Sequence, residues 1–106
     1  MTAITRASID RFEARATEAA AMLKCLASPH RLLVLCQLGE GELQVSQLQD
    51  TIGLSQSALS QHLARLRDEG LVATRRDGTS IFYRIANPDA LKIIATLADI
   101  YCPPEE

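Results

Sequence analysis

Two short helix-forming segments joined by a tight turn constrain the fold of this chain more than any other feature. The first, Val45–Ile52, ends at Gly53, a residue type that readily takes the left-handed conformation that closes a helix. The second, Gln56–Glu69, follows an N-capping Ser55 and is closed by Gly70. Such a short connection between two helices is typical of a helix-turn-helix, so the sequence predicts that motif here.

A change of hydrophobic period after the second helix predicts a β-hairpin. The runs Leu71–Arg75 and Ile81–Ile85 are rich in β-branched and aromatic residues, and they flank Arg76–Thr79, which contains an Asp-Gly pair. Asp-Gly between two such runs is a strong hairpin signal. The predicted fold class is therefore mainly α with a β-hairpin wing, that is, a winged helix-turn-helix.

Both ends of the chain carry a helix that a small domain cannot bury alone. The first places its apolar residues at spacings of a helix packed along another helix, namely Ile9, Phe12, Ala16, Ala19, Leu23 and Leu26. The last is capped by Asn87, runs to about Tyr101 and is apolar on two faces. We therefore predict a homodimer formed through helices at about 8–27 and 88–101.

The length of the chain allows one domain only. We expect residues 1–106 to form a single winged helix-turn-helix, with its reader at 45–70 and its wing at 71–86. A further helix is predicted from Ser28-Pro29 to Leu38, because Ser is a preferred N-cap and Pro fits the first helical position.

The second helix of the reader has the two faces that a DNA-recognition helix needs. Leu59, Leu63 and Leu66 form one apolar stripe, and the opposite side is polar. Gln pairs with adenine, Ser with bases or phosphates, and Arg with guanine or phosphate. The predicted DNA contacts are Ser55, Gln56, Ser57, Ser60, Gln61 and Arg65 on the helix and Arg75, Arg76 and Thr79 on the hairpin. The alternative is a solvated face of a helical interaction domain, but the capped helix pair and the arginine-bearing hairpin together favour DNA.

The net charge of −2 does not exclude nucleic acid, because the charge is unevenly distributed. Residues 54–86 carry five arginines against three acids, whereas residues 32–53 carry three acids and no base. A local basic face is sufficient for binding phosphates.

Several other classes of protein fit the sequence poorly. No apolar run is long enough for a membrane helix, and the charged N-terminus is unlike a signal peptide, so we expect a cytoplasmic chain with reduced cysteines. There is no Gly-rich phosphate loop and no nucleophile elbow, and the chain has only two histidines. We expect no enzyme activity, no catalytic residue and no cofactor.

The run from Leu54 to Val72, LSQSALSQHLARLRDEGLV, closely resembles the signature of the ArsR/SmtB family of bacterial repressors. The resemblance extends from about residue 15 to Cys102 and includes the wing. It implies a homodimer that binds a palindromic operator in double-stranded DNA and is released by a small inducer. His62, between Gln61 and Leu63, is expected to be a structural hydrogen-bonding residue.

The inducer is suggested by the cysteines. Where many relatives have a Cys-Val-Cys metal site, this chain has Gln44-Val45-Ser46, and its last helix has no histidine, so no metal ligand is assigned. The surroundings of Cys36 and Cys102 resemble those of the BigR/SqrR/YgaV branch of the family. That resemblance implies a persulfide or polysulfide inducer that cross-links the two cysteines and releases the DNA. A thiol-only site for arsenite, cadmium or zinc is the alternative.

The positions of the two cysteines also bear on their reactivity. Both lie at predicted helix C-termini, where the helix dipole disfavours a thiolate, so we expect a slow reaction with peroxide and selectivity for persulfide. A competing interpretation of Cys36 is a small buried hydrophobic residue. The third cysteine, Cys25, does not match the pair and is assigned no role.

Overall fold

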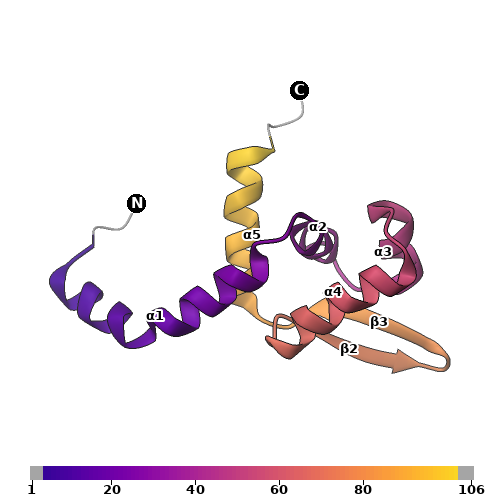
Figure 1. Ribbon diagram of the computed structural model, residues 1–106, viewed down its shortest axis with the longest axis horizontal. Coiled ribbons are helices and arrows are strands. Elements are labelled where there is room, and N and C mark those ends of the chain that lie inside the picture. Colours follow the sequence, from indigo (N-terminus) through magenta and orange to yellow (C-terminus); the bar gives the residue numbers. More distant parts are fainter. Residues whose placement is uncertain (1–3, 103–106) are drawn as a thin grey trace.

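A computed structural model describes residues 4–102, and it contains five helices and three strands in that range (Figure 1). In chain order the elements are α1 (Arg6–Leu26), α2 (Pro29–Leu38), β1 (Leu43–Gln44), α3 (Val45–Ile52), α4 (Gln56–Asp68), β2 (Val72–Asp77), β3 (Ser80–Ile85) and α5 (Pro88–Tyr101). The prediction of a mainly α chain with a hairpin wing is confirmed. The domain predicted over 1–106 includes both termini, and residues 1–3 and 103–106 lie outside the described part.

The helix boundaries follow from the capping residues. The Ser28 Oγ accepts a hydrogen bond from the Arg31 backbone N–H at 3.3 Å, and the Ser55 Oγ accepts one from Ala58 at 3.1 Å. Gly53 has a φ of 82°, so it closes α3 in the left-handed conformation and lets α4 begin three residues later. Two helices differ slightly from their predicted bounds: α1 spans Arg6–Leu26 and not about 8–27, and α4 ends at Asp68, with Glu69 as its cap.

The sheet has one more strand than the sequence predicted. β1 pairs antiparallel with β3, β3 pairs antiparallel with β2, and the strand order is β1-β3-β2. A strand of two residues, Leu43–Gln44, is too short to show an alternating pattern, which is why it was missed. It connects the base of the wing to the start of α3.

The hairpin turn is tighter than predicted. Asp77 pairs with Ser80, so the connection is Gly78-Thr79 and not the four residues 76–79. Gly78 has a φ of 64°, whereas no non-glycine residue of the described chain has a positive φ. A glycine at the first of two central positions is the pattern of a type II′ turn, whose twist lets the ladder continue to the tip.

The core lies between the helix-turn-helix and α2. The predicted stripe of α4 is confirmed, because Leu59, Leu63 and Leu66 are all 1% exposed or less. They belong to a cluster that also contains Val34, Leu35, Leu38, Leu48, Leu71, Val72, Ala90 and Ile94. Each fully buried aliphatic side chain contributes about 1.5–3 kcal/mol, so α4 is fixed by packing as well as by its caps.

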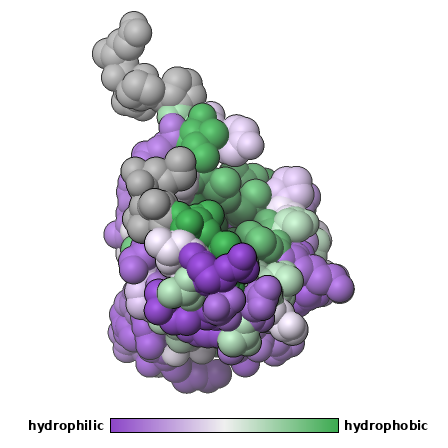
Figure 2. Space-filling view, turned by 90° about the vertical axis from the view of Figure 1, so that its left-hand side faces the viewer, coloured by the Kyte–Doolittle hydropathy of each residue, from purple (hydrophilic) through white to green (hydrophobic). Residues whose placement is uncertain are grey.

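The terminal helices leave much of their apolar surface uncovered. α1 buries only Cys25 and Leu26 and extends away from the rest of the chain (Figure 1). The radius of gyration is 15.6 Å, against about 13 Å for a compact chain of this length. Figure 2 looks onto this side, where hydrophobic residues gather in one area bordered by hydrophilic ones. The large exposed apolar residues of the two helices are Ile9, Phe12, Leu23, Leu91, Ile100 and Tyr101.

The two apolar faces predicted for α5 are not both exposed. Ala90 and Ile94 are buried in the core, and Ile93 and Leu97 pack partly against it. Leu91 and Tyr101, which share a helical face with Ile94 by their spacing, are 40% and 76% exposed. The sheet and α2 cover the first turns of α5 and leave its end uncovered.

Among residues 4–102 no single helix is both long and apolar enough to cross a membrane. Only the pair α1 and α2 satisfies that criterion together, and the two helices are bent by 94° relative to each other.

Candidate DNA-binding surface and thiol pair

The polar face of α4 is open to solvent. Gln56, Ser57, Ser60 and Gln61 are all exposed, on the side of α4 opposite the buried leucine stripe. Ser55 is exposed too, and although its Oγ accepts the capping hydrogen bond from Ala58, its hydroxyl proton and its second lone pair remain free. The structure therefore brings the predicted α4 residues together at the N-terminal end of one helix.

Arg65 lies on the same helix, two turns further on. Its Nε is 4.0 Å from the Glu69 Oε1, and the two side chains are 43% and 36% exposed. An exposed ion pair at this distance contributes at most about 1 kcal/mol, so it holds Arg65 only loosely. The guanidinium remains available to a phosphate.

The two predicted wing arginines lie in different environments. The Arg75 Nε donates hydrogen bonds to both carboxylate oxygens of Glu42, at 2.8 and 3.0 Å, and the guanidinium carbon lies 4.5 Å from the centre of the Phe82 ring. Arg76 is exposed and forms no ion pair with any residue in 4–102. Successive side chains of a strand point to opposite faces, so Arg75 and Arg76 have different neighbours. The side chain of Arg75 is held against the sheet by Glu42, whereas Arg76 and Thr79 are exposed near the hairpin tip.

Glu42 was missed by the sequence reasoning. It stands next to the two-residue strand β1, and only the pairing of β1 with β3 brings it beside the wing. Arg31 was missed for a similar reason. It contacts His62, which lies 31 residues later in the chain.

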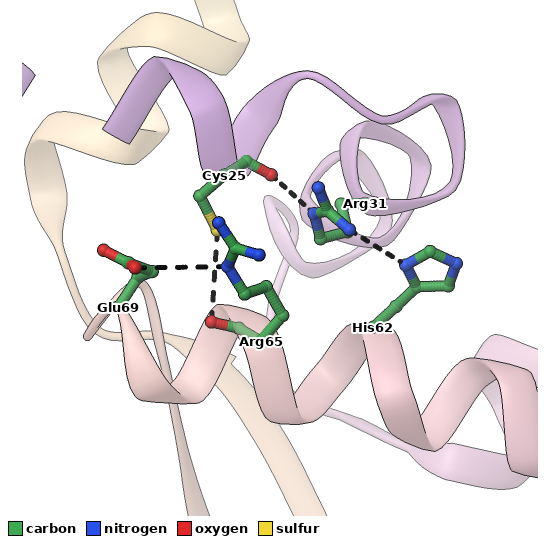
Figure 3. Close-up of polar contacts among 5 residues, drawn as sticks. All are labelled: Cys25, Arg31, His62, Arg65 and Glu69. Atoms are coloured by element: carbon green, nitrogen blue, oxygen red, sulfur yellow. Dashed lines mark hydrogen bonds and ion pairs between the residues drawn. The ribbon is translucent and has the colours of Figure 1, made fainter. Parts of the chain in front are cut away.

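His62 has the structural role that was predicted. Its Nδ1 lies 3.3 Å from the Arg31 Nη1, and its ring is 5.4 Å from that of His30 (Figure 3). His62 is only partly exposed and points toward α2, away from the open polar face of α4.

The three cysteines are free and lie in different surroundings. Cys25 is fully buried at the end of α1, and its Sγ lies 4.0 Å from the Arg65 carbonyl oxygen. Cys36 is exposed on the last turn of α2, so the interpretation of it as a buried hydrophobic residue is wrong. Cys102 is exposed and caps the C-terminus of α5, and its backbone N–H donates a hydrogen bond to the Ala98 carbonyl oxygen at 2.8 Å.

The Cys36 thiol is electrostatically linked to Cys102. Partial burial of the thiol raises the pKa of Cys36, although the residue as a whole is exposed, and the nearby charge of Cys102 raises it further. For Cys36 this direction agrees with the prediction that a thiolate is disfavoured, and the causes are burial first and the second cysteine next. The pair belongs to two helices, α2 and α5, that pack on each other.

Within the described residues 4–102, no group of three or more His, Cys, Asp or Glu side chains is arranged to hold a metal ion. The three thiols in particular do not converge, because Cys25 lies against α4.

Comparison with known proteins decides the family. Residues 28–74 match the family described as bacterial regulatory protein, arsR family. The HTH-type transcriptional regulator YgaV of Escherichia coli (strain K12) is 49% identical over 94 residues, which span 88% of this chain and 95% of YgaV. The chain belongs to the arsR family. The resemblance drawn from Leu54–Val72 is confirmed.

Two solved structures of this family are similar along most of the chain. The transcriptional repressor BigR from Xylella fastidiosa has a TM-score of 0.84 and 42% identity, covering 90% of this chain and 97% of BigR. Reduced HlyU from Vibrio cholerae N16961 has a TM-score of 0.83 and 41% identity, covering 88% of this chain and 98% of HlyU. This arsR-family chain therefore has the winged helix-turn-helix fold predicted from its sequence.

Proposed function

We propose that this protein is a homodimeric transcriptional repressor that binds a palindromic operator and releases it when reactive sulfur joins Cys36 to Cys102. The family, the fold and the likeness to the repressor BigR support the DNA-binding part. The thiol part is supported by one observation above all. Cys36 and Cys102 are both exposed, on helices that pack together, and are close enough for the charge of one to act on the other.

The proposed reading of DNA uses α4 and the wing in different ways. Gln56, Ser57, Ser60 and Gln61 would meet base edges in the major groove, because they are exposed in the first turns of α4. Ser55 and Arg65 would bind the flanking phosphates. Arg76 and Thr79 would reach the adjacent minor groove or its phosphates from the tip of the hairpin.

The proposed dimer forms through α1 and α5. Their exposed apolar side chains, such as Phe12 at 63% and Ile100 at 64%, are the surface that a second copy would cover. A two-fold dimer matches a palindromic operator when its recognition helices lie about 34–36 Å apart, one turn of DNA. Since operator DNA lies in the bacterial cytoplasm, we propose that the protein acts there.

The proposed switch needs no oxidant other than the inducer. One thiolate attacks the outer sulfur of a persulfide RSSH, forming Cys–S–SH and releasing RSH. The second thiolate attacks the cysteine sulfur of Cys–S–SH, the bond to the outer sulfur breaks, and H₂S leaves. The two thiols are oxidised and the transferred sulfur is reduced to sulfide. If a second RSSH reacts first, one additional sulfur remains in the bridge, which spans a longer gap because each S–S bond adds about 2 Å.

The bridge would alter DNA binding through the geometry of the dimer. Cys36 belongs to α2, which packs on α4, whereas Cys102 ends α5, which carries part of the proposed interface. Joining them fixes the orientation of the reader relative to the partner. A shift of the recognition helices away from one helical turn would weaken both half-sites together.

The test combines DNA binding with mass spectrometry of the same sample. The reduced protein should shift DNA from upstream of its own gene at two salt concentrations in the presence of non-specific competitor. A persulfide donor should abolish the shift and produce a Cys36–Cys102 cross-link that carries up to one additional sulfur mass. The variants Cys36→Ser and Cys102→Ser should bind DNA and no longer respond, whereas Cys25→Ala serves as the matched control and should respond like the wild type.

Three results would contradict parts of this proposal. A shift lost to non-specific competitor removes the operator-binding part. Release by hydrogen peroxide as fast as by persulfide removes the selectivity. Release by arsenite, cadmium or zinc without a cross-link supports the thiol-based metal(loid) sensor in its place.

A further inference from the structure

Three helices meet at the side chain of Arg31 (Figure 3). Its Nε donates a hydrogen bond to the backbone carbonyl of Cys25, in the last turn of α1, at 2.5 Å. Its Nη1 lies 3.3 Å from the Nδ1 of His62 on α4. Arg31 itself is fixed in the first turn of α2 by the Ser28 cap. The side chain thus links the end of α1 to the middle of α4, and in this subsection the bridge means these two contacts of Arg31, with Cys25 and with His62.

The hydrogen bond to His62 defines the protonation of the imidazole. A guanidinium has only donors, so the Nδ1 of His62 has to accept. The proton of the neutral ring is then on Nε2, and a second proton on Nδ1 would remove the acceptor and place two cations side by side. The bridge therefore exists only while His62 is neutral.

The surroundings of His62 also favour the neutral form of its imidazole. Burial lowers the pKa of His62, and Arg31 and His30, both on α2, lower it further. α1 presents only the Cys25 carbonyl to the bridge, and on α4 itself the nearest charged side chain is Arg65, one turn along. No carboxylate is among the groups that shift His62.

This bridge has a consequence for the proposed dimer. α1 packs on the rest of the chain through its last two turns, where Cys25 and Leu26 are buried and Met22 is partly buried against the core. Beside the Cys25 thiol at the Arg65 carbonyl, Arg31 is the polar link from this end of α1 to α4. The angle between a helix of the proposed interface and the helix proposed to read DNA depends on it.

We infer that Arg31 is a positioning residue that couples α1 to α4 through neutral His62, and that protonation of His62 uncouples the two helices and weakens operator binding. This inference rests on the DNA-binding part of the proposed function and not on its thiol chemistry. The expected effect of acidification on DNA affinity is opposite to the usual one. A positive charge added to a DNA-binding helix ordinarily strengthens binding to phosphates, so weaker binding on acidification points to lost positioning.

The experiment measures operator affinity of the reduced protein at constant ionic strength from about pH 7.5 to about pH 4.5, a range that extends well below the ordinary histidine pKa because the surroundings lower the pKa of His62. The wild type should lose affinity by about fivefold or more, the lower end of usual coupling between sites. The variant His62→Asn keeps an acceptor near the Nδ1 position and does not titrate. It should bind like the wild type at the higher pH and lose the acid sensitivity.

Two further variants make the result specific. His30→Gln removes the other histidine of the chain and should keep the acid sensitivity. Arg31→Lys keeps the charge but replaces the two nitrogens of the guanidinium fork that donate to the two partners with a single nitrogen. At the higher pH it should bind about fivefold more weakly than the wild type, and it should lose no further affinity on acidification, while circular dichroism reports a native fold. A His62→Asn variant with an unchanged pH profile, or an Arg31→Lys variant with wild-type affinity, overturns the inference.

A second readout separates this inference from the proposed function. The pKa of His62, followed by NMR, should rise in Arg31→Ala because a neighbouring cation is removed. If the protein binds no operator, the proposed function fails, and this titration still tests the bridge. If the operator is bound and the pKa of His62 does not rise in Arg31→Ala, only the bridge fails.

Discussion

Helices α4 and α1 are both amphipathic, yet the chain buries the apolar stripe of only one of them. Leu59, Leu63 and Leu66 of α4 are enclosed by α2, α3 and the sheet. Phe12 and Leu23 of α1 are 63% and 59% exposed. The helix-turn-helix and wing are therefore complete within one chain, whereas the terminal helices are completed by a second copy in the proposed dimer.

The largest effect is expected from breaking the complete region. Leu63→Ala should lower the free energy of unfolding by about 2–5 kcal/mol, because it removes buried methyl groups and leaves a cavity beneath α4. Urea denaturation at one fixed protein concentration measures this loss. Leu33→Ala, at a leucine of α2 that is 47% exposed, is the matched control and should cost about 0.5 kcal/mol or less. Equal losses would contradict the contrast.

Changes in the terminal helices, whose apolar faces stay exposed in one chain, should affect dimer formation more than folding. Phe12→Glu puts a charge on the exposed apolar side of α1 and should raise the dimer dissociation constant by about 30-fold or more. Sedimentation equilibrium measures that constant, and circular dichroism should show the helices retained. The control is Ile81→Glu, at a residue that is 38% exposed on β3, and this strand lies away from α1 (Figure 1), so the dimer should stay intact. A dimer that survives Phe12→Glu would contradict the proposed interface.

The two parts of the proposed DNA-binding surface, α4 and the wing, should contribute to operator affinity in different ways. Gln61→Ala should cost about 1–3 kcal/mol of operator affinity and relax the preference at one base pair. Arg76→Ala should weaken binding to all sequences alike and reduce the salt slope by about 1 per half-site. Fluorescence anisotropy over a salt series, with the operator and single-base variants of it, measures both. A Gln61→Ala variant with unchanged base preference would mean that the Gln61 side chain contacts only solvent and no base.

The smallest effect is expected at the paired arginine of the wing. Glu42→Gln weakens the hold on Arg75 and should raise DNA affinity by about twofold, the scale of a partly exposed ion pair. In an Arg75→Ala background the same change should have no effect, which a double-mutant cycle on operator affinity checks. A twofold gain that persists without Arg75 would mean that Glu42 acts through the overall charge.

Local signals made the helix-turn-helix predictable. Gly53 and Ser55 determine where α3 ends and α4 begins, and the leucine spacing determines which side of α4 is buried. These signals act within one or two helical turns, so the sequence contains them completely. The hairpin was equally visible, except that the ladder continues to Asp77 and Ser80.

Contacts between distant segments could not be predicted in this way. The pairing of Glu42 with Arg75 spans 33 residues, and that of Arg31 with His62 spans 31. Neither pair leaves a local pattern, because two side chains so far apart in the chain become neighbours only after the sheet and the helices have packed.

Local sequence patterns were enough to predict the five helices, the hairpin of β2 and β3, the buried stripe of α4 and the family, but not β1. Capping, turn chemistry and hydrophobic spacing are local properties, and they suffice for that. Only the tertiary structure shows that Arg75 of the wing is paired with Glu42 while Arg76 is exposed. It also decided that Cys25 is buried while Cys36 and Cys102 are exposed, and that α1 meets α4 through Arg31. Burial and charge depend on every segment that surrounds a side chain, and only packing brings those segments together.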